Sequence, residues 1–597
     1  MASNKAVAEE YARRASDRRR VAEEQERRFR TIGYLRLAAG IGAALLAFFV
    51  FGSQGVSIFW MAAPLGAFLV LVVMHARVVQ TLELSRRALR FYEQGLSRVE
   101  DRWMGTGEQG NRFRDPVHVY AEDLDVFGKG SLYELLCTAR TKAGEDTLAS
   151  WLRIPAARQE VSQRQSAVAE LTPRLELREN LALVGENIRA GLHAASLTAW
   201  GQRPAVHFPA GLPVAAAALS TGTILSLAGY LSGFSGRSPL LAFVFVQLIV
   251  SFILRPRVRE VVEGVELPSH DLALLSGMLA LIEGEPSECL KLRELQQRLK
   301  TEGLAASRCI QNLERLANRL EWTHNEFFKP IAAALMWSTQ LAVAIERWRR
   351  HSGQAIQRWI DTAGEFEALC ALAGYSFEHP SDPFPLLSEA GPMYDARGLG
   401  HPLLAEGHCV RNDVYIGPEL PLMVISGSNM SGKSTLLRTV GLNCVLAWAG
   451  GPVRAERLTI SPLQIGASIR VQDSLQDGRS RFYAEIMRLR QIVELTSSPL
   501  PVFFLLDELL SGTNSHDRQI GAAAIVKSLV ERGALGMLTT HDLALAHIAD
   551  SIEPGGVNVH FADTIEDGRL HFDYRLMPGV VERSNALELM RSVGLNV

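Results

Sequence analysis

Residues 422–443, "LMVISGSNMSGKSTLLRTVGLN", place the strongest limit on what this chain can fold into. Within them, the segment 427–434 fits the pattern GxxxxGK[ST] at every fixed position, after an apolar run and before a helix-forming stretch. Glycines let backbone N–H groups converge on phosphate, and the start of the following helix adds a favourable dipole. The pattern therefore predicts a strand, a phosphate loop and a helix. The predicted nucleotide-binding residues are Gly427, Ser428, Asn429, Met430, Ser431, Gly432, Lys433, Ser434 and Thr435.

Two further apolar runs end in polar side chains that we expect beside this loop. The run in "PVFFLLDELLSGTNSHD" ends in Asp507 and Glu508. Asp507 suits direct or water-mediated Mg²⁺ binding together with Ser434, and Glu508 suits orienting or deprotonating the attacking water. The run "LGMLTTH" ends in His541, where a neutral imidazole could sense the γ-phosphate. Short apolar runs between glycine loops and helices are typical of buried parallel strands, so an α/β domain is predicted from about residue 395.

Upstream of this domain the sequence predicts helices. Apolar residues recur at three- and four-residue spacing in 130–153, and the stretches 157–200 and 258–378 continue in that style. Residues 1–31 are rich in Arg and Glu, which favours a solvated helix over a specific binding tail.

Four apolar runs interrupt the helical region in two pairs. Residues 37–51 and 56–74 contain no charged residue, and 212–231 and 239–254 form a similar pair. A membrane span needs about 20 apolar residues, so each pair predicts a transmembrane hairpin. Arginines flank the pairs on the side of the soluble parts, which predicts cytoplasmic termini in an inner, cytoplasmic membrane. The alternative is two buried hairpins of a soluble core. The shorter apolar stretch 330–345 contains Gln340 and is expected to be a buried helix.

These patterns divide the chain into six predicted parts. They are a charged helix (1–31), a first transmembrane hairpin (32–78), a linker helix with the first part of a helical core (79–204), a second hairpin (205–256), the second part of the core (257–392) and the α/β domain (393–597). The formal net charge of −2 means that a nucleic-acid partner would need a local basic patch. Six cysteines occur singly, which indicates a reducing compartment without zinc or disulfides.

Taken together, the motifs resemble the ATPase domain of the MutS mismatch-recognition family. The resemblance rests on "GSNMSGKST", "GRSRFYAEI", "LLDELLSGTNSHD" and "TTHD" in this order and spacing. The lead-in 400–416 and the closing segment 574–595 are also similar to that family, as are 123–152, 164–171 and 365–380 further upstream. The resemblance covers roughly 115–200 and 258–595.

The resemblance implies a magnesium-dependent ATPase of the ABC superclass that works as a homodimer with two composite sites. Its catalytic residues would be Glu508, His541 and, acting on the nucleotide of the other subunit, Ser480. The loop 512–517 would lie across the same interface, and nucleotide binding would open and close helical arms as a clamp.

The sequence also departs from that family. From the resemblance we expect no mismatch-reading N-terminal domain, a helical core that is shortened and interrupted by the second hairpin, and neither the family's dimerising helix-turn-helix nor a nuclease tail. Phe91-Tyr92-Glu93 spells the family's mismatch-probing F-x-E but lies in an amphipathic helix, so we expect this match to be coincidental.

Two functional hypotheses remain from the sequence. The first is a membrane-anchored MutS-like ATPase that binds mismatched, branched or damaged DNA, with 290–300 and 346–359 as local basic candidates. The second is a membrane ATPase of ABC type with a transport, signalling or mechanical role that does not involve DNA. An ABC exporter would show an LSGGQ-type sequence and about six spans per half, whereas this chain has GRS and four predicted spans.

Overall fold

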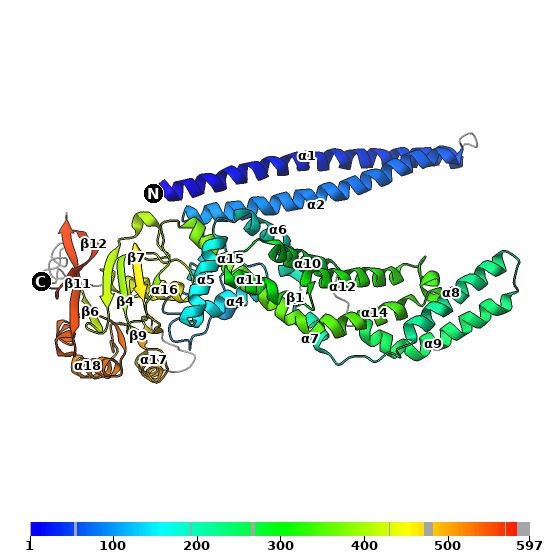
Figure 1. Cartoon of the computed structure of the whole chain (residues 1–597). Helices are drawn as coiled ribbons and strands as arrows, with labels where there is room; N and C mark the ends of the chain where they lie inside the picture. Colours follow the sequence, from blue (N-terminus) through cyan, green and yellow to red (C-terminus); the bar gives the residue numbers. More distant parts are fainter. Residues whose placement is uncertain are drawn as a thin grey trace. The chain divides into compact units, whose positions relative to one another are not determined.

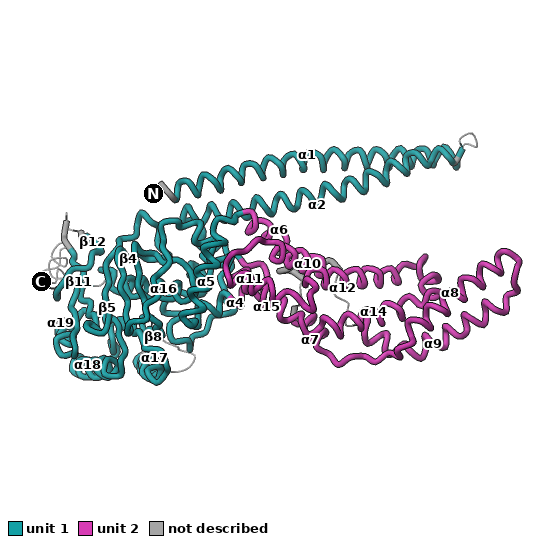
Figure 2. Tube along the Cα trace, in the orientation of Figure 1, with its two compact units in different colours: residues 1–138, 148–175, 369–597 teal, residues 139–147, 176–368 magenta. Residues whose placement is uncertain are grey.

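The computed structural model describes residues 2–52, 57–191, 194–263, 269–428, 430–470, 481–566 and 569–581. Two compact units make up the chain (Figures 1 and 2). Unit 1 comprises residues 1–138, 148–175 and 369–597, and unit 2 comprises 139–147 and 176–368.

A six-stranded sheet forms the centre of the C-terminal part of unit 1. Its order is β12-β11-β6-β10-β9-β8, and all neighbours are parallel except β12, which returns antiparallel beside β11. Every residue of β6 and β10 is buried, as strands covered on both faces require. The three predicted buried parallel strands, which are β6, β9 and β10, are therefore confirmed. The strands are β6 (Leu422–Ser426), β8 (Gln464–Ser468), β9 (Val502–Asp507), β10 (Leu535–Thr540), β11 (Gly556–Glu566) and β12 (Arg569–Pro578).

Helices α17 and α18 cover one face of this sheet. Phe504 and Leu538 of the sheet share a core with Ile492 of α17 and Val526 of α18. A smaller sheet has the order β3-β7-β4-β5; β3, β4 and β5 precede β6 in the chain, and β7 follows it. The remaining elements of this part are α16 (Lys433–Ala449), α17 (Arg481–Leu495), α18 (Ser515–Glu531), α19 (Leu543–Ala546), β3 (Leu386–Leu387), β4 (Tyr394–Leu399), β5 (Asn412–Ile416) and β7 (Arg457–Ile460).

The N-terminal helices α1 (Ala2–Gly52) and α2 (Ala62–Val99) run side by side as one long hairpin (Figure 1). The charged and apolar halves of α1 belong to a single continuous helix. The prediction of a solvated helix over 1–31 was wrong for one face, because Tyr11 and Ala15 are buried against α2. A Cβ atom at Gly95 of α2 would lie 2.8 Å from the Tyr11 ring, so glycine permits this close approach. Phe91 is buried in the same packing, which agrees with a structural role for the F-x-E match.

The amphipathic stretch 130–153 is not one helix. It forms α3 (Leu132–Leu136) and α4 (Lys142–Arg153), and α5 (Arg158–Leu171) follows. The break comes after Cys137, the C-cap of α3, whose backbone is extended.

Unit 2 is helical, as the sequence predicts, apart from the small hairpin β1 (Lys300–Thr301) and β2 (Leu304–Ala305). The stretch 330–345 was expected to be a single buried helix, and this was wrong. Met336 has a left-handed backbone (φ 46°) that divides it, and Ile331 is half exposed. The helices are α6 (Leu175–Gly191), α7 (Ala194–Gln202), α8 (Leu212–Leu231), α9 (Arg237–Glu263), α10 (Ser269–Gly284), α11 (Leu290–Arg298), α12 (Ala306–Glu321), α13 (Lys329–Ala334), α14 (Trp337–Ser352) and α15 (Ile356–Glu378).

Four helices in the described part of the chain are long and apolar enough to cross a membrane, judged by length and composition. They are α1, α2, α8 and α9, which carry the four apolar runs. Their most apolar stretches are 0 %, 0 %, 17 % and 11 % buried, so the fold itself leaves them almost uncovered. Two buried hairpins of a soluble core would show the opposite.

Candidate nucleotide site

In the described part of the loop between β6 and α16, three residues have a left-handed or otherwise positive-φ backbone: two glycines and one exposed methionine. Gly427 and Gly432 have positive φ angles (152° and 99°), and Met430 is left-handed and 85 % exposed. A Cβ atom at Gly432 would lie 3.1 Å from the Tyr574 ring. The predicted strand, loop and helix are therefore present, and the loop leads directly into the N-terminus of α16.

Lys433 lies beneath this loop with its side chain turned back onto it. The Nζ atom donates to the carbonyls of Gly427 (2.9 Å) and Ser428 (2.7 Å). Burial lowers the pKa of Lys433, while the Glu508 and Asp507 carboxylates act in the opposite direction. The Oγ atoms of Ser428 and Ser431 are buried without a hydrogen-bond partner. Unsatisfied hydroxyls beside a cation fit a phosphate group, which accepts hydrogen bonds.

Of the two predicted carboxylates, Asp507 is the last residue of β9 and Glu508 follows it, and both contact the end of β10. Thr539 donates its hydroxyl to Asp507 Oδ1, and the Glu508 N–H donates to the Thr539 carbonyl (3.3 Å). Glu508 has a left-handed backbone (φ 46°), the kind of strain that is found at functional sites. Its Oε1 lies 3.3 Å from His541 Nδ1. The structure thus brings Asp507, Glu508 and His541 together at one edge of the sheet.

A cavity of about 610 Å³ lies between the phosphate loop and Glu508, and its size is within the range for small-molecule sites. Lys433, Ser434, Thr435 and Glu508 line it. A hydroxyl from Ser434 and a carboxylate from Asp507 suit Mg²⁺, which takes few protein ligands and keeps waters and phosphate oxygens. The described residues contain no group of three or more His, Cys, Asp or Glu side chains arranged around a metal. The residues present therefore fit a magnesium ion that is held jointly with phosphate.

The far wall of this cavity consists of residues that were not predicted from the sequence. Tyr574 of β12 and Phe561 of β11 line it, together with the loop between β4 and β5. Tyr574 has a left-handed backbone (φ 55°), and the Asn412 side chain fixes its place by donating to the Tyr574 carbonyl (3.0 Å) and accepting from the Leu576 N–H (2.8 Å). The only sequence hint was that Asn412 and Tyr574 both fall in segments that resemble one family.

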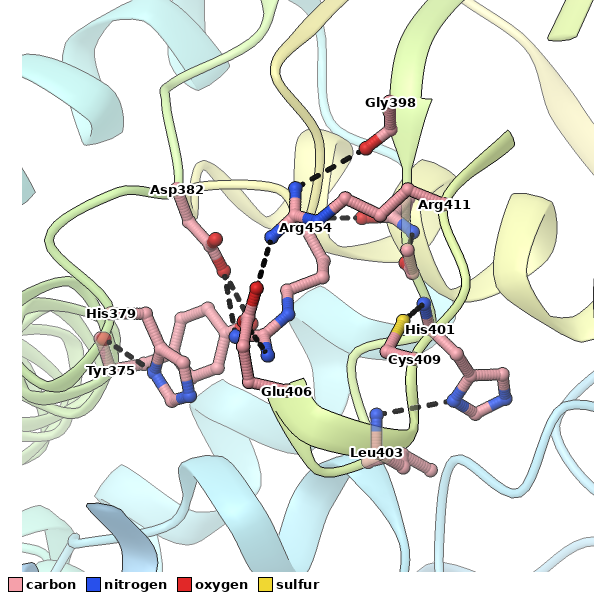
Figure 3. A network of polar contacts seen from close by, with 12 residues as sticks. Tyr375, His379, Asp382, Gly398, His401, Leu403, Glu406, Cys409, Arg411 and Arg454 are labelled. Atoms are coloured by element: carbon pink, nitrogen blue, oxygen red, sulfur yellow. Dashed lines mark hydrogen bonds and ion pairs between the residues drawn. The ribbon is translucent and has the colours of Figure 1, made fainter. Parts of the chain in front are cut away.

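A buried polar network lies behind the loop between β4 and β5 (Figure 3). Arg454 pairs with Asp382 (3.7 Å) and with Glu406, and the Tyr375 hydroxyl donates to Asp382 (3.3 Å). Burial raises the pKa of Asp382 to about 6, although Arg454 opposes the shift. Burial lowers the pKa of His379, which stacks on Tyr375, to about 4. This network anchors Glu406, which lies in the loop that lines the cavity.

Two predicted site residues, Asn429 and Ser480, lie outside the described residues. The loop 512–517 is described, and Gly512 lies against Phe482, the second residue of α17. Asn514 caps α18 by accepting from the Asp517 N–H (2.9 Å). The loop that we expect at a subunit interface is therefore held next to the helix that follows the GRS sequence.

The two basic stretches suggested for DNA use several cations inside the fold of unit 2. The Lys291 side chain is 3 % exposed and pairs with Glu365 (2.6 Å). Arg349 is 5 % exposed and pairs with Glu346 (2.7 Å). These cations stabilise unit 2 and are not available to neutralise phosphates.

Comparison with known proteins agrees with the geometry of the site. Residues 423–596 match the family model "MutS domain V". The chain is 36 % identical over 206 residues to "Endonuclease MutS2" from Thermus thermophilus, covering 34 % of this chain and 27 % of that protein. It is 31 % identical over 265 residues to "DNA mismatch repair protein MutS" from Natronomonas pharaonis, covering 43 % and 29 %. The third relative is "DNA mismatch repair protein MSH6" from Arabidopsis thaliana, with 33 % identity over 222 residues, 35 % of this chain and 16 % of that protein.

The chain thus spans less than a third of the length of each of these relatives. The matched region contains the phosphate loop, the carboxylates after β9, the histidine after β10 and the Tyr574 wall. Residues 423–596 thus match MutS domain V, and through this region the chain is similar to proteins of the MutS family.

Proposed function

We propose that this protein is a membrane-anchored MutS-type ATPase whose nucleotide state sets the arrangement of its cytoplasmic helices on DNA. The observation that carries the proposal is the convergence of Lys433, Ser434 and Glu508 on one cavity, with His541 in contact with Glu508 and with Asp507 beside Glu508 at the end of β9. The names of the relatives support the DNA part of it: two are called DNA mismatch repair proteins and one an endonuclease.

Each side chain has a distinct role in this proposal. Lys433 exchanges its bonds to the loop carbonyls for the β- and γ-phosphates of ATP, and the Ser428 and Ser431 hydroxyls gain acceptors. Ser434 and Asp507 hold Mg²⁺, which supplies charge neutralisation at the phosphates. Glu508 orients the attacking water or takes its proton, and His541 holds the Glu508 carboxylate in place. A phenol at Tyr574 and the Phe561 ring offer an apolar wall for the base.

The site is completed in this proposal by a second copy of the chain. Ser480 would reach the γ-phosphate of the partner, since GRS directly precedes α17 in the sequence and Phe482 of α17 lies beside Gly512 of the loop 512–517. A helix start with a small hydroxyl donor suits an anion. Two such sites related by twofold symmetry would form a homodimer through the ATPase domains.

Membrane anchoring is proposed from the two uncovered hairpins. Phe48, Phe51 and Phe59 are each more than 70 % exposed. Exposed apolar rings are unfavourable in water and favourable in the acyl chains of a bilayer. Both termini and the soluble parts would then face the cytoplasm. Extraction of membranes with alkaline carbonate tests this: the full-length protein should stay in the pellet, and release into the supernatant would refute anchoring.

The choice between DNA and a role without DNA is tested by binding. The full-length protein in nanodiscs is titrated against homoduplex, mismatched and branched DNA over a series of salt concentrations, with and without ATP. Saturable binding that weakens with salt and shifts with ATP supports the proposal. The absence of binding at low salt would reject DNA as the partner and favour the transport, signalling or mechanical alternative.

A further inference from the structure

The turn between α12 and α14, residues 322–337, carries a cluster of exposed aromatic side chains that we call the aromatic tip. Trp322 and Trp337 stack with ring centroids 6.2 Å apart, and Phe328 meets both rings edge-on. Trp337 Nε1 donates to the Arg319 carbonyl (2.8 Å), which ties the start of α14 to the end of α12. Ring stacking and this hydrogen bond thus hold the side chains of the aromatic tip in a defined arrangement.

Much of this surface lies open. Trp322 is 55 % exposed, Phe327 92 % and Ile331 51 %. Contiguous apolar surface of this kind marks a contact with a membrane or a partner, because water solvates it poorly. The aromatic tip takes no part in the nucleotide site.

A hydrogen bond connects the aromatic tip to the middle of α9. Gln247, which is 4 % exposed, donates its amide to the carbonyl of Ala334 (3.1 Å), in the last turn of α13. The last carbonyls of a helix lack partners within it, and an amide inside an apolar span needs an acceptor. Each group therefore satisfies the other.

Gln247 lies in the middle of the apolar run of α9, eight residues before Arg255. At about 1.5 Å of rise per residue, the bond lies about 12 Å along the helix from the arginines that follow the run. Helix α14 packs against α9 and α8 within unit 2, and α13 packs against α8, so the aromatic tip lies beside the α8–α9 hairpin (Figure 1).

We propose that the aromatic tip is inserted into the interfacial layer of the cytoplasmic leaflet, between the lipid headgroups and the upper acyl chains, beside α8 and α9. The inference rests on the proposed membrane spans and adds a lipid-binding surface to them. Tryptophan suits this layer because its ring is apolar and its N–H is polar, and Phe327 would reach the acyl boundary. Lys329, at the start of α13, pairs with Glu326 but stays about half exposed, so its ammonium group can also contact a lipid phosphate.

Other occupants fit this surface less well. Between residues 322 and 337 the only Lys or Arg is Lys329, which pairs with Glu326, so the aromatic tip lacks the cluster of cations that a DNA backbone requires. A second copy of the chain would have to reach a surface that lies at the level of a membrane span, where the surrounding medium is lipid.

Photo-crosslinking in the full-length protein tests the proposal. The aromatic photo-reactive amino acid benzoylphenylalanine replaces one residue at a time, in nanodiscs of phosphatidylcholine and phosphatidylglycerol. The three positions are Phe327 in the aromatic tip, Phe252 on the exposed face of α9, and Tyr415 on β5 as a soluble control. After illumination, mass spectrometry measures the lipid adduct at each position.

We expect lipid adducts at 327 and 252 that exceed those at 415 by about tenfold or more, the contrast between lipid-facing and water-facing sites. Adducts at 252 without adducts at 327 would overturn the insertion of the aromatic tip and leave the spans intact. The absence of adducts at both positions would overturn the spans and, with them, this inference. A crosslink from 327 to a second copy of the chain or to added DNA in place of lipid would also overturn it.

Discussion

Tyr574 is a residue whose role depends on its neighbours in space. Its ring closes over Gly432 of the phosphate loop, and its carbonyl is held by Asn412, 162 residues earlier in the chain. An aromatic ring at this place gives the cavity a wall that can stack on a nucleotide base.

Replacing Tyr574 with alanine should weaken ATP binding and leave the chemistry alone. Loss of one stacking contact costs about 1 kcal/mol or more, which corresponds to a rise of about fivefold or more in the KM for ATP at a nearly constant kcat. Steady-state kinetics of ATP hydrolysis measure both constants. Tyr415→Ala is the matched control, because Tyr415 is also a partly exposed strand residue but does not line the cavity. A fall in kcat at unchanged KM would contradict the proposed wall.

His379 makes the stability of the fold depend on pH. Burial and the nearby Arg454 lower its pKa to about 4, against 6.5 for a free imidazole. Between pH 6.5 and pH 4 the imidazole is protonated in the unfolded chain but not in the folded chain. The contribution of His379 to the free energy of unfolding is therefore present above pH 6.5 and is lost as the pH falls towards 4. Asp382 acts in the opposite direction, since its raised pKa of about 6 means that the folded chain keeps a proton longer.

The variant His379→Gln separates the contribution of His379 to the pH dependence of stability from that of Asp382. Because glutamine does not titrate, the drop in stability between about pH 7 and about pH 5 should be smaller than in the wild type by about 2 kcal/mol. Thermal unfolding of both proteins at the two pH values gives the comparison. An equal drop in both proteins would show that His379 is not held neutral in the folded state.

At the scale of elements, Glu378 joins the N-terminal hairpin to the rest of unit 1. Its side chain is 1 % exposed, accepts from Arg98 of α2 (2.6–3.0 Å) and accepts from the Tyr11 hydroxyl of α1 (3.1 Å). The same turn of α15 leads to His379 and to the network behind the cavity. The base of the hairpin is therefore bonded to the helix end that supports the nucleotide site.

Glu378→Ala should loosen the hairpin. Breaking a buried ion pair by removing one partner costs about 3–5 kcal/mol, because the other charge stays buried. Hydrogen exchange around Tyr11 and Arg98 should rise strongly. Glu93→Ala removes the exposed pair with Arg19 on the same hairpin and should cost at most about 1 kcal/mol. Equal protection in the two variants would argue against a docking role for Glu378.

The elements also show where a sequence suffices to predict structure. Strands β6, β9 and β10 could be predicted because a strand that is buried on both faces must be apolar throughout. The buried face of α1 was missed because long Arg and Glu side chains surround a sparse stripe that includes Tyr11 and Ala15. The break at Met336 has no glycine or asparagine to announce it. Tyr574 was missed because its position depends on the antiparallel return of β12 beside β11.

At the scale of the whole molecule, the proposal requires two copies of the chain. Each cavity would take Lys433 and Glu508 from one subunit and Ser480 from the other. A protein with a twofold axis built in this way can be complemented by mixing inactive variants.

Mixing Lys433→Ala with Ser480→Ala tests the shared site. In a mixed dimer, one cavity keeps an intact Lys433 and receives an intact Ser480. Random exchange should therefore restore about a quarter of wild-type ATP hydrolysis, whereas each variant alone stays inactive. No recovery after subunit exchange, verified by a pull-down of differently tagged subunits, would place Ser480 outside the partner's site.

The most direct test of the account is magnesium-dependent ATP hydrolysis by the purified full-length protein, compared with Glu508→Gln. The account predicts turnover in the wild type and a loss of about 10²- to 10⁴-fold in the variant, with ATP binding retained, since only the group that acts on water has changed. A wild-type protein that fails to hydrolyse ATP, or a variant that hydrolyses it at the same rate, would contradict the account.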